Sequence, residues 1–375
     1  MGLTTGTKLD KRPSTRRCWA DMYNIKANLL REKLQEAGFE MHGARLNFIA
    51  RFVMALITVR TVSLATLASV LNAAVEVASN EKRIKRFFGD MVIEGDMLAR
   101  CVLAWLPKER YLLSLDRTNW KLGSTDINIL MLAVAHEGMA YPLLWTILPH
   151  AGNSDTRERL ELLDKALKLV NFEHIEALVA DREFIGEDWF GGLKERRIAF
   201  VMRVKSNTRI GSRGRTLSAG KRYGHLKLGE PYVSPKRCWV LGSRLFLAAT
   251  RAPDGDLVVL ACTAQADLAL SRYARRWNIE TLFGALKGRG FNLEDTHLTQ
   301  GERLSTLLAL LALAFTWAYL LGTWLHEQKP LKLKKHGYAP KSLFKRGFEL
   351  LRAAITAAPN EAKYPLELCL KVLSP

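Results

Sequence analysis

Four side chains with different chemistry are spaced so that one side of a helix would present them together. They are Tyr273, Arg276, Glu280 and Lys287, within residues 271–290. At about 100° per residue, these positions form a stripe about 60° wide and about 21 Å long. A hydroxyl, a guanidinium, a carboxylate and an ammonium in one line suit a metal ligand flanked by phosphate-binding groups. The alternative interpretation is a charged helix face that only contacts solvent.

The residues around this stripe favour a helix that packs against the rest of the chain. Asp267 is a suitable N-cap, and Gly288 and Gly290 are stop signals. Gly284, inside the helix, costs about 1 kcal/mol relative to alanine, which indicates close approach of backbone or ligand. The opposite face is apolar and contains Leu268, Leu270, Ile279, Leu282 and Phe283. We therefore expect a single helix with one face buried.

Upstream of this helix, the hydrophobic periodicity alternates between strands and helices. Glu137-Gly138 is a hairpin turn signal, and Asp155 is a helix cap. Strands are expected over residues 111–116, 127–136, 140–148, 175–181 and 198–204, and helices over 156–170 and 185–195. The order β-β-β-α-β-α-β matches a ribonuclease H-like core. The predicted fold class is α/β (α+β).

Two of these strands are predicted to end in an acid. Asp116 closes the first and Asp181 the fourth, and these strands are neighbours in a ribonuclease H-like sheet, where the helix carrying Glu280 would cross them. Clustered carboxylates are tolerated when cations neutralise them, and oxygen ligands without His or Cys favour Mg2+ or Mn2+. Two ions about 3.5–4 Å apart would promote phosphodiester displacement. Taken singly, each aspartate suits a cap or an ion pair, and Glu183 and Glu187 are rival acids.

The spacing Tyr-x2-Arg-x3-Glu-x6-Lys resembles the YREK signature of bacterial DDE transposases of the insertion-sequence-4 type. Asp116-Arg117-Thr118 resembles the first acid motif of that family, and Asp181-Arg182-Glu183-Phe184 resembles the second. The resemblance covers residues 105–325 approximately. It implies cut-and-paste transposition of an insertion sequence, by metal-dependent cleavage of DNA ends and strand transfer, with or without a hairpin intermediate.

The resemblance also implies the ligands and partners of the site. Asp116, Asp181 and Glu280 would be the catalytic residues and would hold two Mg2+ (or Mn2+) ions. The partners would be double-stranded DNA, both the terminal repeats of the element and its target. Because two ends must be held together, the active form would be a homodimer on paired DNA ends.

DNA contacts outside the three acids are implied as well. Tyr273, Arg276 and Lys287 would bind the phosphates next to the cut. Arg203 and Lys205, at the end of the fifth strand, resemble the family's basic contacts to the phosphates of the transposon end. A solvated sheet edge is the alternative for this basic pair.

Residues 207–265 predict a β-rich insertion, because they are rich in Gly, Arg and Lys and contain short strand-like runs. Trp239 is the only tryptophan in this insertion. The resemblance implies that it stacks on a base flipped out of the duplex. A buried core tryptophan is the alternative.

The N-terminal part predicts helices over residues 46–59, 64–78 and 80–88. The last of them carries Lys82, Arg83, Lys85 and Arg86, and the group resembles a helix-turn-helix DNA reader. A helical bundle with a basic surface is the alternative. The expected division of the chain is a flexible basic arm (1–25), an N-terminal helical DNA-binding domain (26–106), the catalytic core (107–206 and 266–328), the β-rich insertion (207–265) and a basic C-terminal helical region (329–375).

The composition favours a polyanionic partner. The formal net charge is +19, and the basic residues are spread along the chain, which suits nucleic acid or an anionic membrane surface. The five cysteines form no CxxC pair and suit a reducing cytoplasm, and no secretory signal is evident. Residues 304–325 carry no charge and are long enough to span a bilayer, but we expect a helix buried in the core.

Three other functions remain as alternatives at this point. A nuclease of the same fold would only hydrolyse DNA, and a domesticated DNA-binding regulator would keep the fold without the chemistry. A membrane protein anchored by residues 304–325 is the third.

Overall fold

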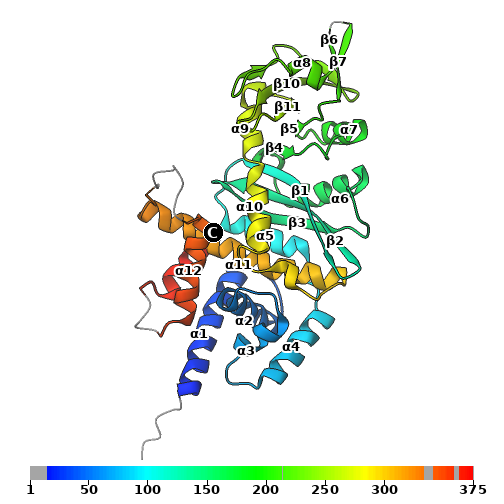
Figure 1. Cartoon of the computed structure of the whole chain (residues 1–375). Helices are drawn as coiled ribbons and strands as arrows, with labels where there is room; N and C mark the ends of the chain where they lie inside the picture. The colour runs from blue at the N-terminus through cyan, green and yellow to red at the C-terminus, as the bar shows by residue number, and fades with distance from the viewer. Residues whose placement is uncertain (1–14, 213, 333–340, 359–362, 375) are drawn as a thin grey trace, which may run out of the picture.

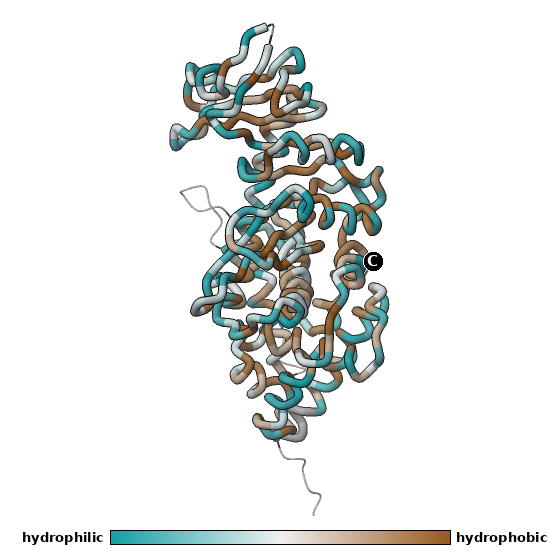
Figure 2. Tube along the Cα trace, turned by 90° about the vertical axis from the view of Figure 1, so that its right-hand side faces the viewer, coloured by the Kyte–Doolittle hydropathy of each residue, from teal (hydrophilic) through white to brown (hydrophobic). Residues whose placement is uncertain are grey.

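The computed structural model describes residues 15–212, 214–332, 341–358 and 363–374. Helices from the N-terminal part lie at one end of the molecule and the β-rich insertion at the other, with the central sheet between them (Figure 1). Hydrophobic stretches occur at both ends, as Figure 2 shows.

The centre of the molecule is a mixed sheet with the strand order β3-β2-β1-β4-β5. Strands β1, β4 and β5 run parallel, whereas β2 and β3 are antiparallel to their neighbours. The strands are β1 (Tyr111–Leu122), β2 (Thr125–His136), β3 (Met139–Ile147), β4 (Ile175–Ala180) and β5 (Phe200–Arg203). This is the strand arrangement of a ribonuclease H-like core, so the predicted fold class is confirmed.

Local signals in the core act as the sequence predicts. Glu137 and Gly138 both have positive φ, 47° and 81°, as a two-residue hairpin turn requires. Asp155 caps α6 (Thr156–Leu167) in a capping box with Glu158, and α7 (Glu187–Glu195) follows β4.

Strand β1 is longer than predicted, so the expectation that Asp116 ends it is wrong. The strand continues to Leu122 because β2 pairs with it from Leu112↔Ala135 to Leu122↔Thr125. The ladder between β1 and β4, however, stops at Leu115↔Ala180. Asp116 therefore lies where the parallel pairing ends rather than where the strand ends.

The insertion is rich in β-strands and extends the central sheet. Strand β11 pairs antiparallel with β5, and the order continues as β11-β10-β9-β6-β7, with β8 on β10. Its elements are β6 (Arg209–Ser212), β7 (Arg215–Ser218), α8 (Ala219–Tyr223), β8 (Pro231–Val233), β9 (Cys238–Val240), β10 (Ser243–Arg251) and β11 (Leu257–Cys262). The insertion is thus connected to the core through backbone hydrogen bonds.

The N-terminal part is helical from residue 15 onward, so the flexible arm expected over residues 1–25 is wrong for residues 15–25. Residues 1–14 lie outside the described part. Asn80 of α4 donates to the carbonyl oxygens of Ala68 (2.9 Å) and Asn72 (3.0 Å), which joins α4 to α3. The helices are α1 (Thr15–Glu36), α2 (Gly43–Val59), α3 (Leu64–Leu71), α4 (Val77–Asp90) and α5 (Gly95–Trp105).

The uncharged run forms α11 (Gly301–Gln328), which packs against α2, α5, α12 and β3. This helix is long and apolar enough to span a membrane, but 89% of its apolar stretch is buried inside the protein. Trp317 donates from Nε1 to the carbonyl oxygen of Cys369 (2.8 Å), and the Tyr319 hydroxyl donates to that of Glu137 (2.7 Å). The expectation of a buried core helix is confirmed.

The C-terminal helices lie against α11 and the N-terminal part. Lys26 of α1 donates to the carbonyl oxygens of Ala354, Ile355 and Ala357 at the end of α12, at 2.8–2.9 Å. These helices are α12 (Leu343–Thr356) and α13 (Leu366–Leu370), and residues 333–340 of the basic run before them lie outside the described part.

Candidate active site

The segment that carries the stripe consists of two consecutive helices, α9 (Ala269–Ala274) and α10 (Trp277–Leu286). The single helix capped by Asp267 is therefore a wrong prediction. Between the two helices, Arg275 and Arg276 donate to the carbonyl groups three residues earlier, which is a tighter turn than an α-helix makes. Both residues keep right-handed helical dihedrals, so the chain direction is maintained.

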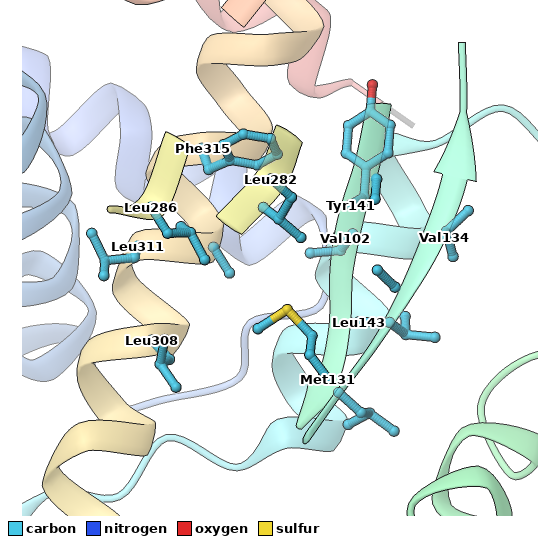
Figure 3. Packing of buried hydrophobic residues seen from close by; sticks show 14 of the residues in the cluster. Val102, Met131, Val134, Tyr141, Leu143, Leu282, Leu286, Leu308, Leu311 and Phe315 are labelled. Atoms are coloured by element: carbon cyan, nitrogen blue, oxygen red, sulfur yellow. The ribbon is translucent and has the colours of Figure 1, made fainter. Parts of the chain in front are cut away.

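Helix α10 is fixed by its apolar face. Figure 3 shows Leu282 and Leu286 from α10 in one cluster with Phe315 of α11 and Tyr141 of β3. On the α9 side, Arg272 and Arg275 both pair with Glu176 of β4, at 2.8 and 3.1 Å. These contacts orient the polar stripe toward the sheet.

The sheet brings two of the predicted acids to one place. Leu115↔Ala180 is the last pair between β1 and β4, and Asp116 and Asp181 directly follow these two residues. The Tyr273 hydroxyl of α9 donates to Asp181 Oδ1 at 2.9 Å. The first helix of the stripe thus contacts the acid next to β4.

Arg276 connects the other two acids. Its guanidinium lies 3.1 Å from Asp116 Oδ2 and 2.7 Å from Glu280 Oε1, and its side chain is only 7% exposed. Each of the three predicted acids is therefore in contact with Tyr273 or Arg276.

Burial raises the pKa of Asp116 to about 6. The backbone N–H of Arg117 and the Arg276 guanidinium lower this pKa, whereas the neighbouring carboxylates of Glu183 and Asp181 raise it. Burial also raises the pKa of Tyr273, so that its phenol stays protonated and donates. At Asp116, burial and the neighbouring carboxylates therefore oppose the Arg276 guanidinium.

The family model described as "Transposase DDE domain" matches residues 107–317, more than half of the chain. The chain belongs to the transposase DDE domain family. The matched region of this DDE domain contains all three acids, the stripe and the insertion. No curated protein matches the chain.

Solved structures similar to this DDE transposase chain resemble it only distantly. One is a piggyBac transposase in a synaptic complex with hairpin DNA, with 12% identity over 98% of this chain and 87% of that chain, at a TM-score of 0.43. Another is endonuclease V from Bacillus subtilis, with 10% identity over 68% and 95% of the two chains, at a TM-score of 0.25. Neither likeness supports a conclusion about the site.

DDE transposase domains generally use divalent metals, and the ligand chemistry here fits such an ion. Asp116, Asp181 and Glu280 supply only carboxylate oxygens, the donors that Mg2+ and Mn2+ prefer. Among the described residues, no three His, Cys, Asp or Glu side chains lie close enough together to bind one metal ion as they stand. Arg276 lies between two of the three acids, where it satisfies their charge.

The rival acids of the DDE domain have other partners. Glu183 pairs with Arg117 at 3.2 Å, and Arg117 also donates to Asn128. Glu187 lies on α7 against Gly242 of the insertion, where an added Cβ would overlap its carboxylate.

The basic residues predicted to contact DNA differ in their surroundings. Lys287 pairs with Glu294 at 2.8 Å and lies over the ring of Trp120. Arg203 pairs with Asp256, and Lys205 is exposed. Lys205 is thus the member of this group that is most open to solvent.

Trp239 is 56% exposed, so it is not a core tryptophan of the insertion. It lines an open pocket of about 520 Å³. Basic side chains share the lining of this pocket, namely Arg222, Lys236, Arg237 and Arg244. Strand β9, which carries Trp239, belongs to the same extended sheet as β1, which carries Asp116.

One aromatic residue near the acids was not singled out from the sequence. Trp277 is 62% exposed, and the Arg276 guanidinium lies 5.7 Å from its ring centroid. Its position directly after Arg276 places it off the stripe. The signal that could have found it is a large apolar side chain outside the buried face of α10.

Proposed function

We propose that this DDE transposase is of the insertion-sequence-4 type and moves an insertion sequence by metal-dependent cut-and-paste transposition. The observation that carries the proposal is that Tyr273 contacts Asp181 and that Arg276 contacts both Asp116 and Glu280. Asp116 and Asp181 lie where the parallel pairing of β1 and β4 stops, and Glu280 lies on α10, so the stripe adjoins three carboxylates from separate elements. End cleavage and strand transfer are the reactions that such a site suits.

In the proposed mechanism, Asp116, Asp181 and Glu280 are the metal ligands. Two Mg2+ (or Mn2+) ions would supply Lewis acid chemistry that activates an attacking oxygen and stabilises a leaving one. The three carboxylates would hold these ions next to the reacting phosphate, and the burial of Asp116 strengthens its electrostatic interactions.

The DNA contacts in this proposal surround the acids. Tyr273, Arg276 and Lys287 hold the phosphates next to the cut, and Arg203 and Lys205 hold phosphates farther along the transposon end. For Lys287 and Arg203 this requires exchange of a carboxylate partner for a phosphate, and both exchanges retain a charge-assisted hydrogen bond.

Base stacking is assigned to the exposed Trp239 in this proposal. Trp239 stacks on a flipped base beside the basic pocket of the insertion, which lowers the cost of a hairpin end. Helices α2 to α4 of the domain over residues 26–106 bind the terminal repeat. Two copies on paired DNA ends form the active assembly.

Cleavage and strand transfer on labelled DNA that bears the element's terminal repeats would test the proposal. Wild type should cleave and join in Mg2+ and do neither in EDTA. Glu280→Gln should lose at least about a thousandfold of both activities and keep end binding, because it removes a metal ligand without adding charge. Glu302→Gln, an exposed residue in the first turn of α11, is the matched control and should be fully active.

Two other outcomes would replace the proposal. Metal-dependent cutting without any joining would indicate a nuclease of the same fold. Binding of the ends without cleavage by wild type would indicate a DNA-binding regulator.

A further inference from the structure

The guanidinium of Arg276 lies inside the acid site rather than on the DNA-facing surface. It is the charge partner of both Asp116 and Glu280, and the side chain is 7% exposed. Its third nitrogen, Nε, is buried and has no hydrogen-bond partner among the described residues. The two terminal nitrogens of Arg276 are paired with carboxylates, whereas Nε has no partner in the described part of the chain. Ion pairing therefore holds this guanidinium more than complete hydrogen bonding does.

The position of this guanidinium matters for any cation that uses the same carboxylates. A divalent ion needs the oxygens that Arg276 now contacts, and a positive guanidinium at about 3 Å would repel it. The cation and the guanidinium therefore compete for Asp116 and Glu280. Only one of them can neutralise these two acids at a time.

Two aromatic rings adjoin the guanidinium, one partly buried and one exposed. The Arg276 guanidinium lies 5.5 Å from the ring of Tyr273 and 5.7 Å from that of Trp277. Tyr273 is partly buried, whereas Trp277 is 62% exposed at the surface. Movement toward the Trp277 side would bring the guanidinium to solvent, where a phosphate could replace the carboxylates as its partner.

We propose that Arg276 is the internal counter-ion of the metal ligands in the free protein, and that its transfer to a DNA phosphate opens the site for metal. This inference rests on the proposed function of the acids. Metal binding and DNA binding are then coupled, so that each strengthens the other by the same factor. The DNA-free protein has weak metal affinity because Arg276 already satisfies two of its three acids.

Mn2+ binding, measured by the electron paramagnetic resonance signal of free Mn2+, tests this coupling. Without DNA, Arg276→Gln should bind Mn2+ at least about tenfold more tightly than wild type, because a competing charge is removed. Duplex DNA with the terminal repeat should raise the Mn2+ affinity of wild type by a similar factor. It should have little effect on that of Arg276→Gln.

A neighbouring arginine provides the matched control. Arg275 pairs with Glu176 and donates to the carbonyl oxygen of Ala135, away from the three acids. Arg275→Gln should bind Mn2+ as wild type does. Arg276→Lys should fall between wild type and Arg276→Gln, because an ammonium keeps the charge but contacts both acids less well.

Thermal unfolding separates this role from a purely structural one. Arg276→Gln should have a lower midpoint than wild type in EDTA, and Mn2+ should raise that midpoint more than it raises the wild-type one. A lower midpoint with Mn2+ affinity equal to or weaker than wild type would overturn the inference. Absence of Mn2+ binding in every variant, with or without DNA, would overturn the metal site itself and with it the proposed function.

Discussion

Asp116 is the residue at which burial and charge conflict most clearly. Its carboxyl is 14% exposed, and its pKa is raised from 3.8 to about 6, chiefly by burial. Burial therefore favours the protonated form of this carboxyl more in the folded protein than in the unfolded chain. A site that keeps an ionised acid here at neutral pH sacrifices stability for function.

This conflict predicts a pH-dependent gain from Asp116→Asn in EDTA. Between pH 3.8 and about 6 the folded protein binds the proton more strongly than the unfolded chain, so wild-type stability falls as pH rises through this window. Asparagine does not titrate. Near pH 8 the variant should be more stable by up to ~3 kcal/mol, and the difference should shrink as pH falls below about 6.

Urea unfolding at several pH values would measure this difference. Asp126→Asn, an exposed position on the same hairpin that pairs with Lys121, should show no comparable gain. A variant that is less stable than wild type at pH 8 would mean that the Arg276 contact outweighs burial at Asp116.

Helices α11 and α12 pack so closely that a side chain at Gly322 or Gly347 would overlap the backbone of the other helix. An added Cβ on Gly347 would overlap the carbonyl oxygen of Ala318, and one on Gly322 would overlap that of Leu343. The two helices therefore approach each other closely through glycine on both sides. Because α11 also packs against α10, this contact supports the helix that carries Glu280.

Gly347→Ala should therefore destabilise the protein by about 1–3 kcal/mol or more, since one helix must move to relieve the overlap. Chemical unfolding monitored by circular dichroism would measure the loss. Gly191→Ala, in the interior of α7, is the control because its added Cβ meets no heavy atom within 4 Å. It should be neutral or gain up to about 1 kcal/mol from helix propensity.

At the scale of the whole molecule, charge is the dominant property. The formal net charge is +19, and four exposed basic residues gather on α4 alone, namely Lys82, Arg83, Lys85 and Arg86. Association with DNA should therefore release many counterions. A protein that contacts six to ten phosphates loses roughly 10³–10⁵-fold in affinity between 50 and 200 mM salt.

Lys85→Gln should weaken binding to any duplex and reduce the slope of log affinity against log salt by about one. Fluorescence anisotropy at several salt concentrations would show this change. Lys165→Gln, exposed in the last turn of α6, serves as the control and should leave the slope unchanged. An unchanged slope for Lys85→Gln would remove α4 from the DNA interface.

The sequence by itself determined those features that depend on neighbouring residues. The Glu137-Gly138 turn, the Asp155 cap and the strand periods come from local backbone preferences, so they were predictable. Helical spacing also predicted that Arg276 and Glu280 lie on one side of α10, but it did not predict the break after Ala274 or that the helix ends before Lys287. The uncharged run predicted an apolar helix, but only its packing decided between the protein core and a membrane span.

Only the tertiary structure decided what pairs across the chain. Strand β1 passes Asp116 because β2 supplies a partner as far as Leu122, and β11 joins the insertion to β5 through long-range hydrogen bonds. Local spacing contains no information about either partner. The same holds for Arg276: helical spacing places it beside Glu280, but its contact with Asp116 spans 160 residues and exists only because the sheet and α10 meet.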